Sequence, residues 1–454
     1  MDLPNYYFAD LPDASALTAK LVTESCQSLM ENRTRFLLSH STQSLISIIA
    51  SLARDWLDPE FPFREMALER GPAETGFSRP TLQSGLDRFF RQLTQPNLEA
   101  LVTQDLGSLR RLDEIVSTEI ELKGNRASFA RGPELLVHIT AGVLPNPALT
   151  SIVLGLLIRS AQFVKCARGT SFLPRMFAHS LYAIHPKIAS CLEIAEWQGG
   201  NETLETALFA HAHCLTATGS DETLASIRQR LPIKSRFIGY GHKISCSYIA
   251  REALVRYRRA ELVASVAEDI LAWNQLGCLS PHVVYVENGG GIPPAEFAEF
   301  LAGELANREQ DEPRGELAPQ DAAAITTRRM VYQVRAAEGE HTKLWTSQNS
   351  TAWTVVYEED PTFHLSCLNR FIYVKQLAGL DQLMISIAHL QGSVSTVALA
   401  APGARFSEIA LALARWGVSR VCPAGQMQNP PLTWRHDGRP ALADLITWTD
   451  LELP

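Results

Sequence analysis

The stretch that decides the fold is LLVHITAGVLPNPALTSIVLGLLIRSAQFVKC, from Leu135 to Cys166. Its first six residues form a short apolar run typical of a buried strand, and the glycine and prolines of AGVLPNP end that run. The following residues predict an apolar helix over 148–160, and FVKC predicts a second strand over 163–166. Because a strand, a helix and a strand in this order form the repeating unit of parallel sheets, the stretch predicts an α/β domain.

The same alternation continues downstream of this stretch. We expect, in chain order, a helix over 173–182, a strand over 215–218, a helix over 221–230 with Ser220 as its N-cap, and strands over 236–239 and 244–249. After a long helical stretch over 251–277, a strand over 283–286 and a further alternation over 292–420 predict a second α/β domain.

The segment before these domains has a different character. Leu45, Ile49, Leu52 and Trp56 recur at helical spacing, which predicts a mainly helical region. Residues 116–122 and 127–131 then flank a Gly-Asn pair and predict a hairpin whose turn lies at that pair.

Composition and charge exclude several classes of protein. Lys and Arg number 41 against 49 Asp and Glu, a net charge of −8, which argues against a nucleic-acid-binding surface. The longest apolar runs, such as Ile152 to Ile158, are far shorter than the roughly 20 residues of a membrane span. The first residues lack the basic start and apolar core of a signal peptide, so we expect a cytoplasmic protein.

The cysteines and histidines indicate neither a disulfide framework nor a metal site. The eight cysteines are scattered without a CxxC pair. His211 and His213 could share one face of a strand, but no further ligand has a suggestive spacing, so we expect no metal.

Cys278 is the most informative candidate for chemistry. It lies in QLGCLSP, residues 275–281, where a helix is expected to deliver the chain to Gly277 and Pro281 prevents its continuation. A cysteine at such a break can be exposed in a cleft, beside backbone N–H groups that face an oxyanion, although a lone cysteine is more often a buried apolar residue. Gly219 and Ser220, between a strand and a helix, form a candidate phosphate turn, although the acidic pair that follows them would repel a pyrophosphate.

Together these segments resemble the acyl-CoA reductase family, the fatty-acid reductase subunit of bacterial bioluminescence, within the aldehyde dehydrogenase superfamily. QLGCLSP is the most specific piece, followed by the tail segments 420–425 and 434–438. The weaker pieces are residues 138–142, 163–165, 218–220 and 239–243, and their order along the chain matches the superfamily.

The resemblance implies a role for several residues. Cys278 would be the nucleophile and would form a thioacyl-enzyme. Lys165 would bind the adenosine ribose, Gly219 and Ser220 would line the dinucleotide phosphates, and Gly241 would belong to the turn that faces the nicotinamide.

Three departures from the family pattern refine this picture. Where many aldehyde dehydrogenases carry a water-activating glutamate, this chain has Gly239, which favours reduction of a thioester over its hydrolysis. Arg168 replaces the carboxylate typical of NAD-preferring enzymes, so the expected cofactor is NADPH, with NADH as the alternative. Val143 replaces the expected asparagine, and either Asn146 or a donor such as Asn274, working with a backbone N–H, would then stabilise the oxyanion.

The resemblance also assigns the predicted segments. The fold expected is aldehyde-dehydrogenase-like, with two parallel-sheet α/β domains, a helical N-terminal region and a small arm that pairs subunits into a homo-oligomer. The expected segments are a helical region over 1–112, an oligomerisation hairpin over 113–132, a dinucleotide-binding domain over 133–255, a catalytic domain over 256–425 and a C-terminal tail over 426–454.

The predicted function is NADPH-dependent reduction of an acyl thioester, with a long fatty acyl group suggested by the family. The donor is left open between CoA, a carrier protein and an acyl-protein partner such as an acyl-transferring enzyme or an acyl-protein synthetase. Two alternatives remain: an aldehyde dehydrogenase that works in the oxidative direction, and a catalytically silent thioester-binding subunit.

Overall fold

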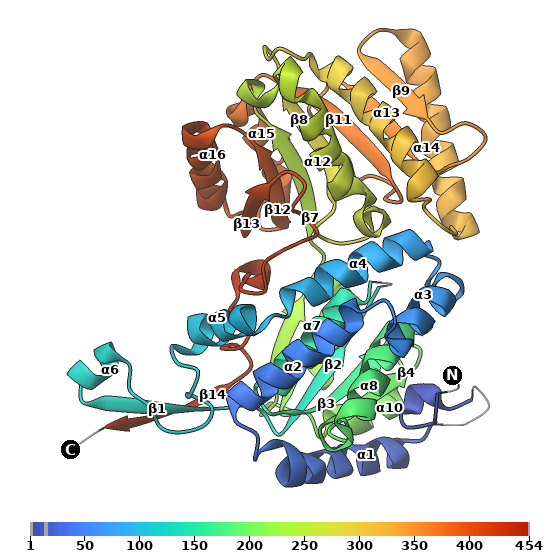
Figure 1. The fold of residues 1–454 in the computed structure, drawn as a ribbon. Helices are drawn as coiled ribbons and strands as arrows, with labels where there is room; N and C mark the ends of the chain where they lie inside the picture. Colours follow the sequence, from blue (N-terminus) through green and yellow to red (C-terminus); the bar gives the residue numbers. More distant parts are fainter. Residues whose placement is uncertain (1–2, 13–16, 143, 453–454) are drawn as a thin grey trace. The chain divides into compact units, whose positions relative to one another are not determined.

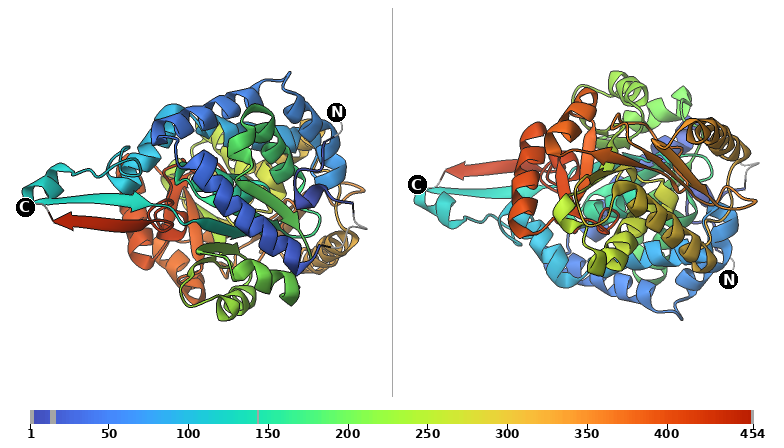
Figure 2. Two further views of the ribbon diagram at one scale, coloured as in Figure 1. Left: turned by 90° about the horizontal axis from the view of Figure 1, so that it is seen from below. Right: turned by 90° about the horizontal axis from the view of Figure 1, so that it is seen from above.

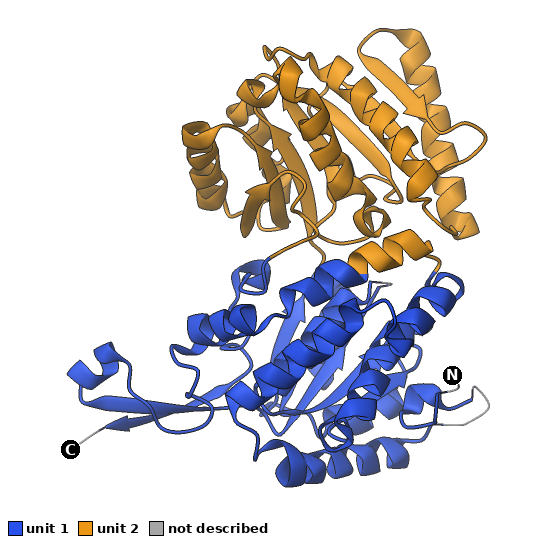
Figure 3. Ribbon diagram, viewed as in Figure 1, with its two compact units in different colours: residues 1–75, 86–241, 431–454 blue, residues 76–85, 242–430 orange. Residues whose placement is uncertain are grey.

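The chain divides into two compact units (Figure 3). The computed structural model describes residues 3–12, 17–142 and 144–452, so Val143 lies outside the described residues. Unit 1 comprises residues 1–75, 86–241 and 431–454, and unit 2 comprises residues 76–85 and 242–430.

Unit 1 is built on a five-stranded parallel sheet with the strand order β4-β3-β2-β5-β6 (Figure 1). Its strands are β2 (Leu135–Ile139), β3 (Ala161–Cys166), β4 (Leu192–Glu196), β5 (Cys214–Thr218) and β6 (Arg236–Tyr240). The chain first moves outward from β2 to β4 and then returns to place β5 on the other side of β2. Ligands of open parallel sheets bind beyond the carboxyl ends of the strands where the order reverses, which here is between β2 and β5.

Helices cover both faces of this sheet. They are α1 (Ala19–Asn32), a π-helical turn η2 (Arg33–Leu37), α2 (Thr42–Leu57), α3 (Pro62–Thr75), α5 (Gln95–Leu106), α7 (Asn146–Leu157), α8 (Phe172–Ile184), α9 (Pro186–Ala189), α10 (Glu202–Phe209) and α11 (Asp221–Arg230). On one face, apolar residues of α1, α10 and α11 form a core with β2, β3 and β5. On the other face, α7 contacts the sheet, where Gln162 donates a hydrogen bond of 3.1 Å to the carbonyl of Ile152.

The hairpin expected over residues 113–132 forms only as a single antiparallel bridge, in which Val116 and Ser128 exchange backbone hydrogen bonds of 3.1 and 2.9 Å. Its first half forms the short helix α6 (Glu119–Lys123), because Thr118 and Glu121 make a reciprocal capping box. Its second half, β1 (Arg126–Arg131), pairs antiparallel with β14 (Thr447–Glu452) at the other end of the chain. The two strands extend side by side away from the rest of unit 1 (Figure 2).

Unit 2 is built on a seven-stranded sheet with the strand order β13-β12-β7-β8-β11-β10-β9. Neighbouring strands are parallel except β9, which runs antiparallel to β10 at the edge. The strands are β7 (Ile244–Ile249), β8 (Pro281–Glu287), β9 (Thr342–Thr346), β10 (Thr354–Glu358), β11 (Phe371–Leu377), β12 (Val394–Ala400) and β13 (Arg420–Pro423). The fold class expected from the sequence, with two mainly parallel sheets, is therefore confirmed.

The helices of unit 2 divide between the two faces of its sheet. They are α12 (Arg259–Leu271), α13 (Pro294–Asp311), α14 (Pro319–Glu338), α15 (Leu380–Ser386) and α16 (Gly403–Trp416), and α4 (Arg79–Gln92) contributes its residues up to Gly85. Apolar residues of α12 and α13 pack on one face, and those of α14, α15 and α16 pack on the other.

Strand β7 lies in a different sheet from the one expected. The boundary at residue 255 placed it with the strands before it, whereas it is a central strand of unit 2, paired with β8 and β12. Every residue of β7 is buried. A short apolar strand of this kind fits the interior of either sheet, so its pattern alone does not indicate its partners.

Within the described residues, no single helix has the length and apolar character of a membrane span. Ala19–Leu37 and Thr42–Leu57 meet the criterion only as a pair, and the pair is bent by 105°.

Candidate active site

Cys278 lies in a tight turn immediately before β8. The N–H of Ser280 donates a hydrogen bond of 2.9 Å to the carbonyl of Gly277, which makes Cys278 the second residue of a four-residue turn. Two side chains hold this turn: the Ser245 hydroxyl donates to the carbonyl of Cys278 at 2.7 Å, and the Gln428 amide donates to the Ser280 hydroxyl at 2.6 Å. The turn is thus fixed while the Cys278 side chain stays exposed.

The other cysteines are poor nucleophiles. Of the eight, all within the described residues, Cys278 alone is exposed. Burial raises the pKa of six thiols to about 12, which suppresses their thiolates near neutral pH; these are Cys26, Cys166, Cys191, Cys214, Cys246 and Cys422. Desolvation also raises the pKa of the remaining thiol, that of Cys367.

The expected helix does not reach Gly277. Helix α12 ends at Leu271, and Trp273, Asn274 and Gln275 then adopt left-handed backbone angles, with φ of 53°, 53° and 65°. Three successive non-glycine residues in this region store strain, which persists only where surrounding contacts hold it. Pro281, expected only to stop the helix, is also the first residue of β8.

A buried polar network supplies those contacts. The Asn274 amide donates to the carbonyl of Arg314 at 2.7 Å, and its oxygen accepts from Nε of Arg370 at 3.0 Å. Arg370 is fully buried and is itself left-handed, as are the two residues before it. Gln275 donates to the carbonyl of Pro281 at 2.7 Å. Both polar atoms of the Asn274 side chain therefore support the left-handed segment before Cys278. The role of Asn274 as an oxyanion donor stays a prediction.

Lys165 is a buried cation at the carboxyl end of β3, where unit 1 would bind a ligand. Its side chain is almost fully buried, and it has no hydrogen bond or ion pair with any other described residue. Its ammonium group lies 5.8 Å from the ring centroid of Trp197. Desolvation lowers the pKa of Lys165, although nearby carboxylates partly offset this effect. An ammonium with no charged partner among the described residues, at a ligand-binding edge, is available to a polar or anionic ligand.

Arg168 lies in the loop that follows β3. The carboxylate of Glu196, at the end of β4, holds this loop by accepting from the backbone N–H groups of Gly169 at 2.7 Å and Ser171 at 3.2 Å. Arg168 itself is exposed and makes no ion pair within the described chain. The loop is thus anchored while its guanidinium is free to meet a ligand.

The candidate phosphate turn forms as expected. Ser220 is the N-cap of α11, and its hydroxyl accepts from the N–H of Thr223 at 3.3 Å. Gly219 precedes it at the end of β5. Gly241 follows β6, and a Cβ there would lie 2.6 Å from the carboxylate oxygen of Asp221. This carboxylate beside the turn is the feature that opposes a pyrophosphate.

Two further expectations concern Asn146 and the histidine pair. Asn146 is the first residue of α7, and its buried side-chain oxygen makes no hydrogen bond within the described residues. His211 and His213 lie before β5 rather than on it, and no group of three metal-ligating side chains occurs in the described ranges.

His282 is a polar residue near Cys278 that the sequence pattern does not indicate. The pairing register of β7 and β8 shifts beside this residue, and its Nδ1 accepts from the backbone N–H of Ser366 at 3.2 Å. A register shift of this kind re-aims a side chain and is common near active sites. A histidine within a strand leaves no local signal of such a contact, so only the folded chain reveals it.

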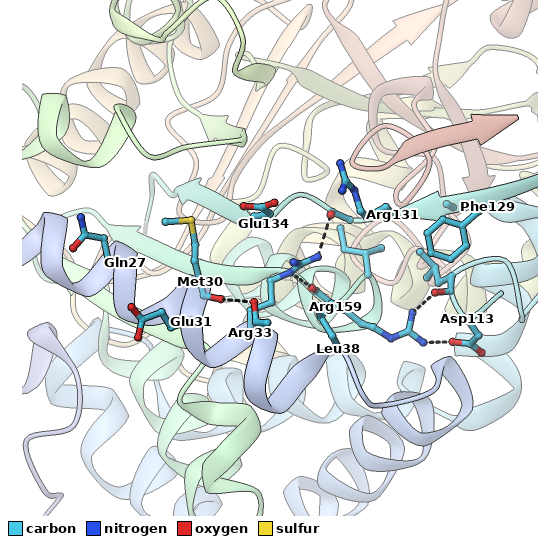
Figure 4. A pocket seen from close by; sticks show the side chains of 15 residues that line it. Gln27, Met30, Glu31, Arg33, Leu38, Asp113, Phe129, Arg131, Glu134 and Arg159 are labelled. Atoms are coloured by element: carbon cyan, nitrogen blue, oxygen red, sulfur yellow. Dashed lines mark hydrogen bonds and ion pairs between the residues drawn. The ribbon is translucent and has the colours of Figure 1, made fainter. Parts of the chain in front are cut away.

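A cavity of about 790 Å³ in unit 1 contains none of these candidate residues (Figure 4). It lies at the amino ends of β2 and β3, opposite the edge that carries Lys165. Its two buried arginines form hydrogen bonds within the protein: Arg33 donates to the carbonyl of Arg159 at 2.6 Å, and Arg159 donates to the carbonyl of Leu112 at 2.8 Å.

Comparison with known proteins identifies the fold and then the family. A NAD-dependent benzaldehyde dehydrogenase from Corynebacterium glutamicum superposes with a TM-score of 0.68 at 12% identity, covering 96% of this chain and 91% of that one. At such low identity the likeness establishes the fold alone, which is that of the aldehyde dehydrogenases. The chain belongs to the acyl-CoA reductase (LuxC) family, whose family model matches residues 37–448. The resemblance expected from the motifs is thereby confirmed.

Two curated relatives are similar over most of their length. The long-chain acyl-protein thioester reductase of Aliivibrio fischeri is 23% identical over 465 residues, covering 100% of this chain and 91% of the relative. The long-chain acyl-protein thioester reductase 2 of Photobacterium leiognathi is 24% identical over 362 residues, covering 78% of this chain and 70% of the relative.

Proposed function

We propose that this protein reduces an acyl thioester to an aldehyde through a thioacyl-enzyme on Cys278. The observation that carries the proposal is that the one exposed cysteine sits in the anchored turn before β8 of a chain in the acyl-CoA reductase family. An exposed thiol on a fixed turn can reach a bound carbonyl without rearrangement of the backbone.

The first half-reaction uses only residues of this chain. The Cys278 thiolate attacks the thioester carbonyl, and the departing thiol leaves Cys278 acylated. Backbone N–H groups of the turn, together with an asparagine amide from Asn146 or Asn274, stabilise the tetrahedral oxyanion. One well-placed donor contributes about 3 kcal/mol.

The proposed site for a nicotinamide dinucleotide is the carboxyl edge of the unit 1 sheet. The strand order reverses there, Lys165 offers an unpaired ammonium, and the N-terminus of α11 offers backbone N–H groups beside Gly219 and Ser220. The chemistry that a bound reduced nicotinamide supplies is hydride transfer to the thioacyl carbon. Cys278 then departs as a thiolate when the hemithioacetal collapses to the aldehyde.

The preferred dinucleotide is NADPH. Lys165 is the last residue but one of β3, and the exposed Arg168 lies two residues after the end of that strand. Two cations there favour a 2′-phosphate. Arg168→Ala should raise KM for NADPH about tenfold while leaving KM for NADH almost unchanged, as expected for loss of a charge-assisted hydrogen bond. Equal effects on both dinucleotides would contradict this preference.

Reduction is favoured over hydrolysis because position 239 is a glycine, which supplies no base, and its surroundings are close. An ideal Cβ on Gly239 would lie 3.1 Å from the ring of Phe237 and 3.2 Å from the side chain of Leu224. A carboxylate at this position would require both neighbours to move. A thioacyl-enzyme without such a base persists long enough to be reduced.

The proposed substrate is a long-chain acyl thioester, with either CoA or a protein as the thiol carrier. The names of both relatives support a long acyl chain and a protein-bound acyl group. An acyl-transferring enzyme or an acyl-protein synthetase would then be the natural partner. Comparing long-chain acyl-CoA with the same acyl group on a pantetheine carrier protein distinguishes the two donors.

The β1–β14 arm supports a homo-oligomer. An isolated two-stranded ribbon is only marginally stable in water. Trp448 of β14 is 40% exposed, and Ile120 and Leu122 of the adjoining helix α6 are 83% and 62% exposed. Removing residues 447–454 should lower the number of subunits in the assembly, as measured by sedimentation. An unchanged number of subunits would remove this support.

The decisive experiment is mass spectrometry of the intact protein after mixing with a long-chain acyl thioester and no dinucleotide. We expect an acyl adduct on Cys278 that disappears, with release of aldehyde, when NADPH is added. Cys278→Ala should form no adduct. Full reductase activity in that variant would overturn the proposal.

A further inference from the structure

The parallel pairing of β7 and β8 places a histidine and Cys278 at the same edge of the unit 2 sheet. Ser245 of β7 pairs with Pro281 of β8. His242 lies three residues before Ser245, and Cys278 lies three residues before Pro281. Both residues therefore lie just before the amino ends of their strands, at the same edge of the unit 2 sheet. Neighbouring strands in a sheet are about 4.8 Å apart.

A direct contact ties the two segments together at this edge. The Ser245 hydroxyl donates to the carbonyl of Cys278 at 2.7 Å, and it also accepts from the backbone N–H of Thr396 at 3.2 Å. The Cys278 turn is therefore bound to the strand that follows His242. His242 is exposed, and no hydrogen bond joins its ring to another described residue.

Two neighbouring ionisable groups, those of His282 and Lys243, are already occupied. His282 is buried, and its Nδ1 accepts a hydrogen bond from the N–H of Ser366. The proton of the neutral ring therefore resides on Nε2, and the lone pair of Nδ1 is already used by this hydrogen bond. Burial, with a smaller effect from nearby His242, lowers the pKa of His282 to about 4. The ammonium group of Lys243 donates to the carbonyl of Gly392 at 2.6 Å. Of these three described side chains, that of His242 is the one available as a base.

We propose that His242 is the general acid–base catalyst that serves Cys278 in acyl transfer, an inference that rests on the proposed function. Position 239, where a carboxylate base is absent, lies three residues earlier in the chain. A cysteine and a histidine within reach of one another form a recurring nucleophile–base pair.

The step balances without a redox change. His242 takes the proton from Sγ of Cys278 as the sulfur attacks the thioester carbonyl. A bond forms between Sγ and the acyl carbon, and the bond from that carbon to the carrier sulfur breaks. The imidazolium of His242 then gives its proton to the departing thiolate, which leaves as a thiol.

The test measures acylation alone, without any dinucleotide. The rate of adduct formation from a long-chain acyl-CoA is followed by quenched-flow mass spectrometry between about pH 5.5 and 8.5, the range in which histidines titrate. Wild type should accelerate as the pH rises through this range. His242→Gln should be slower by about 100-fold near neutral pH and should lose this acceleration, as expected for removal of a general base.

His341→Gln is the matched control, because His341 is an exposed histidine of the same unit, 82% exposed and paired with Glu359. It should acylate as wild type does. His242→Ala should recover part of its rate when imidazole is added, an effect that a purely structural role would not produce.

The outcomes separate the two proposals. Acylation of His242→Gln at the wild-type rate and with the wild-type pH profile would overturn the role of His242 while leaving Cys278 as the nucleophile. Failure of imidazole to restore a slow His242→Ala variant would also overturn it. A wild-type protein that no long-chain thioester acylates would overturn the proposed function itself, and this inference with it.

Discussion

Replacing Gly85 by alanine tests how the Cys278 turn is supported. An ideal Cβ on Gly85 would lie 2.0 Å from Cζ2 of Trp273 and 2.5 Å from two further atoms of that ring. Carbon atoms in contact are about 3.5–4.0 Å apart, so the indole must move by roughly 1.5 Å. Trp273 is buried and begins the left-handed segment that leads to Cys278.

Two opposing effects set the expected change in stability. Overpacking a buried site costs about 1–3 kcal/mol, whereas replacing a helical glycine by alanine gains up to about 1 kcal/mol. Gly85→Ala should therefore lower the free energy of unfolding by about 1–2 kcal/mol. Gly303→Ala, in α13, is the control, because a Cβ there meets nothing within 4 Å and only the propensity gain applies.

The assay combines denaturation with the reactivity of Cys278. Urea unfolding followed by tryptophan fluorescence should give a lower midpoint for Gly85→Ala and a slightly higher one for Gly303→Ala. The rate at which iodoacetamide alkylates Cys278 should differ from that of the wild-type protein in Gly85→Ala and should equal it in Gly303→Ala. Equal stability and equal alkylation rates in the two variants would show that the ring does not constrain the turn.

Three further predictions follow from buried polar groups. Lys165→Met should raise the thermal unfolding midpoint, because an unpaired buried cation is removed, and should weaken dinucleotide binding measured by calorimetry; a midpoint below that of wild type would contradict the account. Burial lowers the pKa of His138 from 6.5 to about 4, so its contribution to stability is present above pH 6.5 and is lost as the pH falls toward 4; His138→Leu should remove up to about 3 kcal/mol of this pH dependence in denaturation curves. Arg111→Met should speed hydrogen exchange in β1, because the fully buried guanidinium binds Ser128 and Glu121 at 2.6 and 2.8 Å, and unchanged exchange would place the support of the arm elsewhere.

Much of the fold could be predicted because local signals agree with it. The apolar runs that become β2 and β8 are buried strands, and Ser220 caps α11 as its residue type predicts. The exposure of Cys278 also agrees with a cysteine placed at a break in the chain. These features depend on neighbours in the sequence, which periodicity and capping preferences report directly.

Features that depend on distant partners were missed or misplaced. The residues of β1 predict a strand but not that its partner is β14, more than 300 positions later. The left-handed angles of Asn274 depend on Arg370, and nothing in either local sequence indicates that contact. Long-range pairing of this kind is decided by which surfaces meet in the folded chain.

The sequence by itself determined the α/β alternation, the family motif around Cys278 and the absence of a carboxylate at Gly239. Only the tertiary structure decided that β7 joins the second sheet, that Ser245 binds the carbonyl of Cys278, and that His242 therefore lies at the same sheet edge as Cys278. The physical reason is that the backbone hydrogen bonds between strands are formed by the same N–H and C=O groups whatever the side chains are. Register and neighbour are chosen by packing across the whole domain, which no local pattern contains.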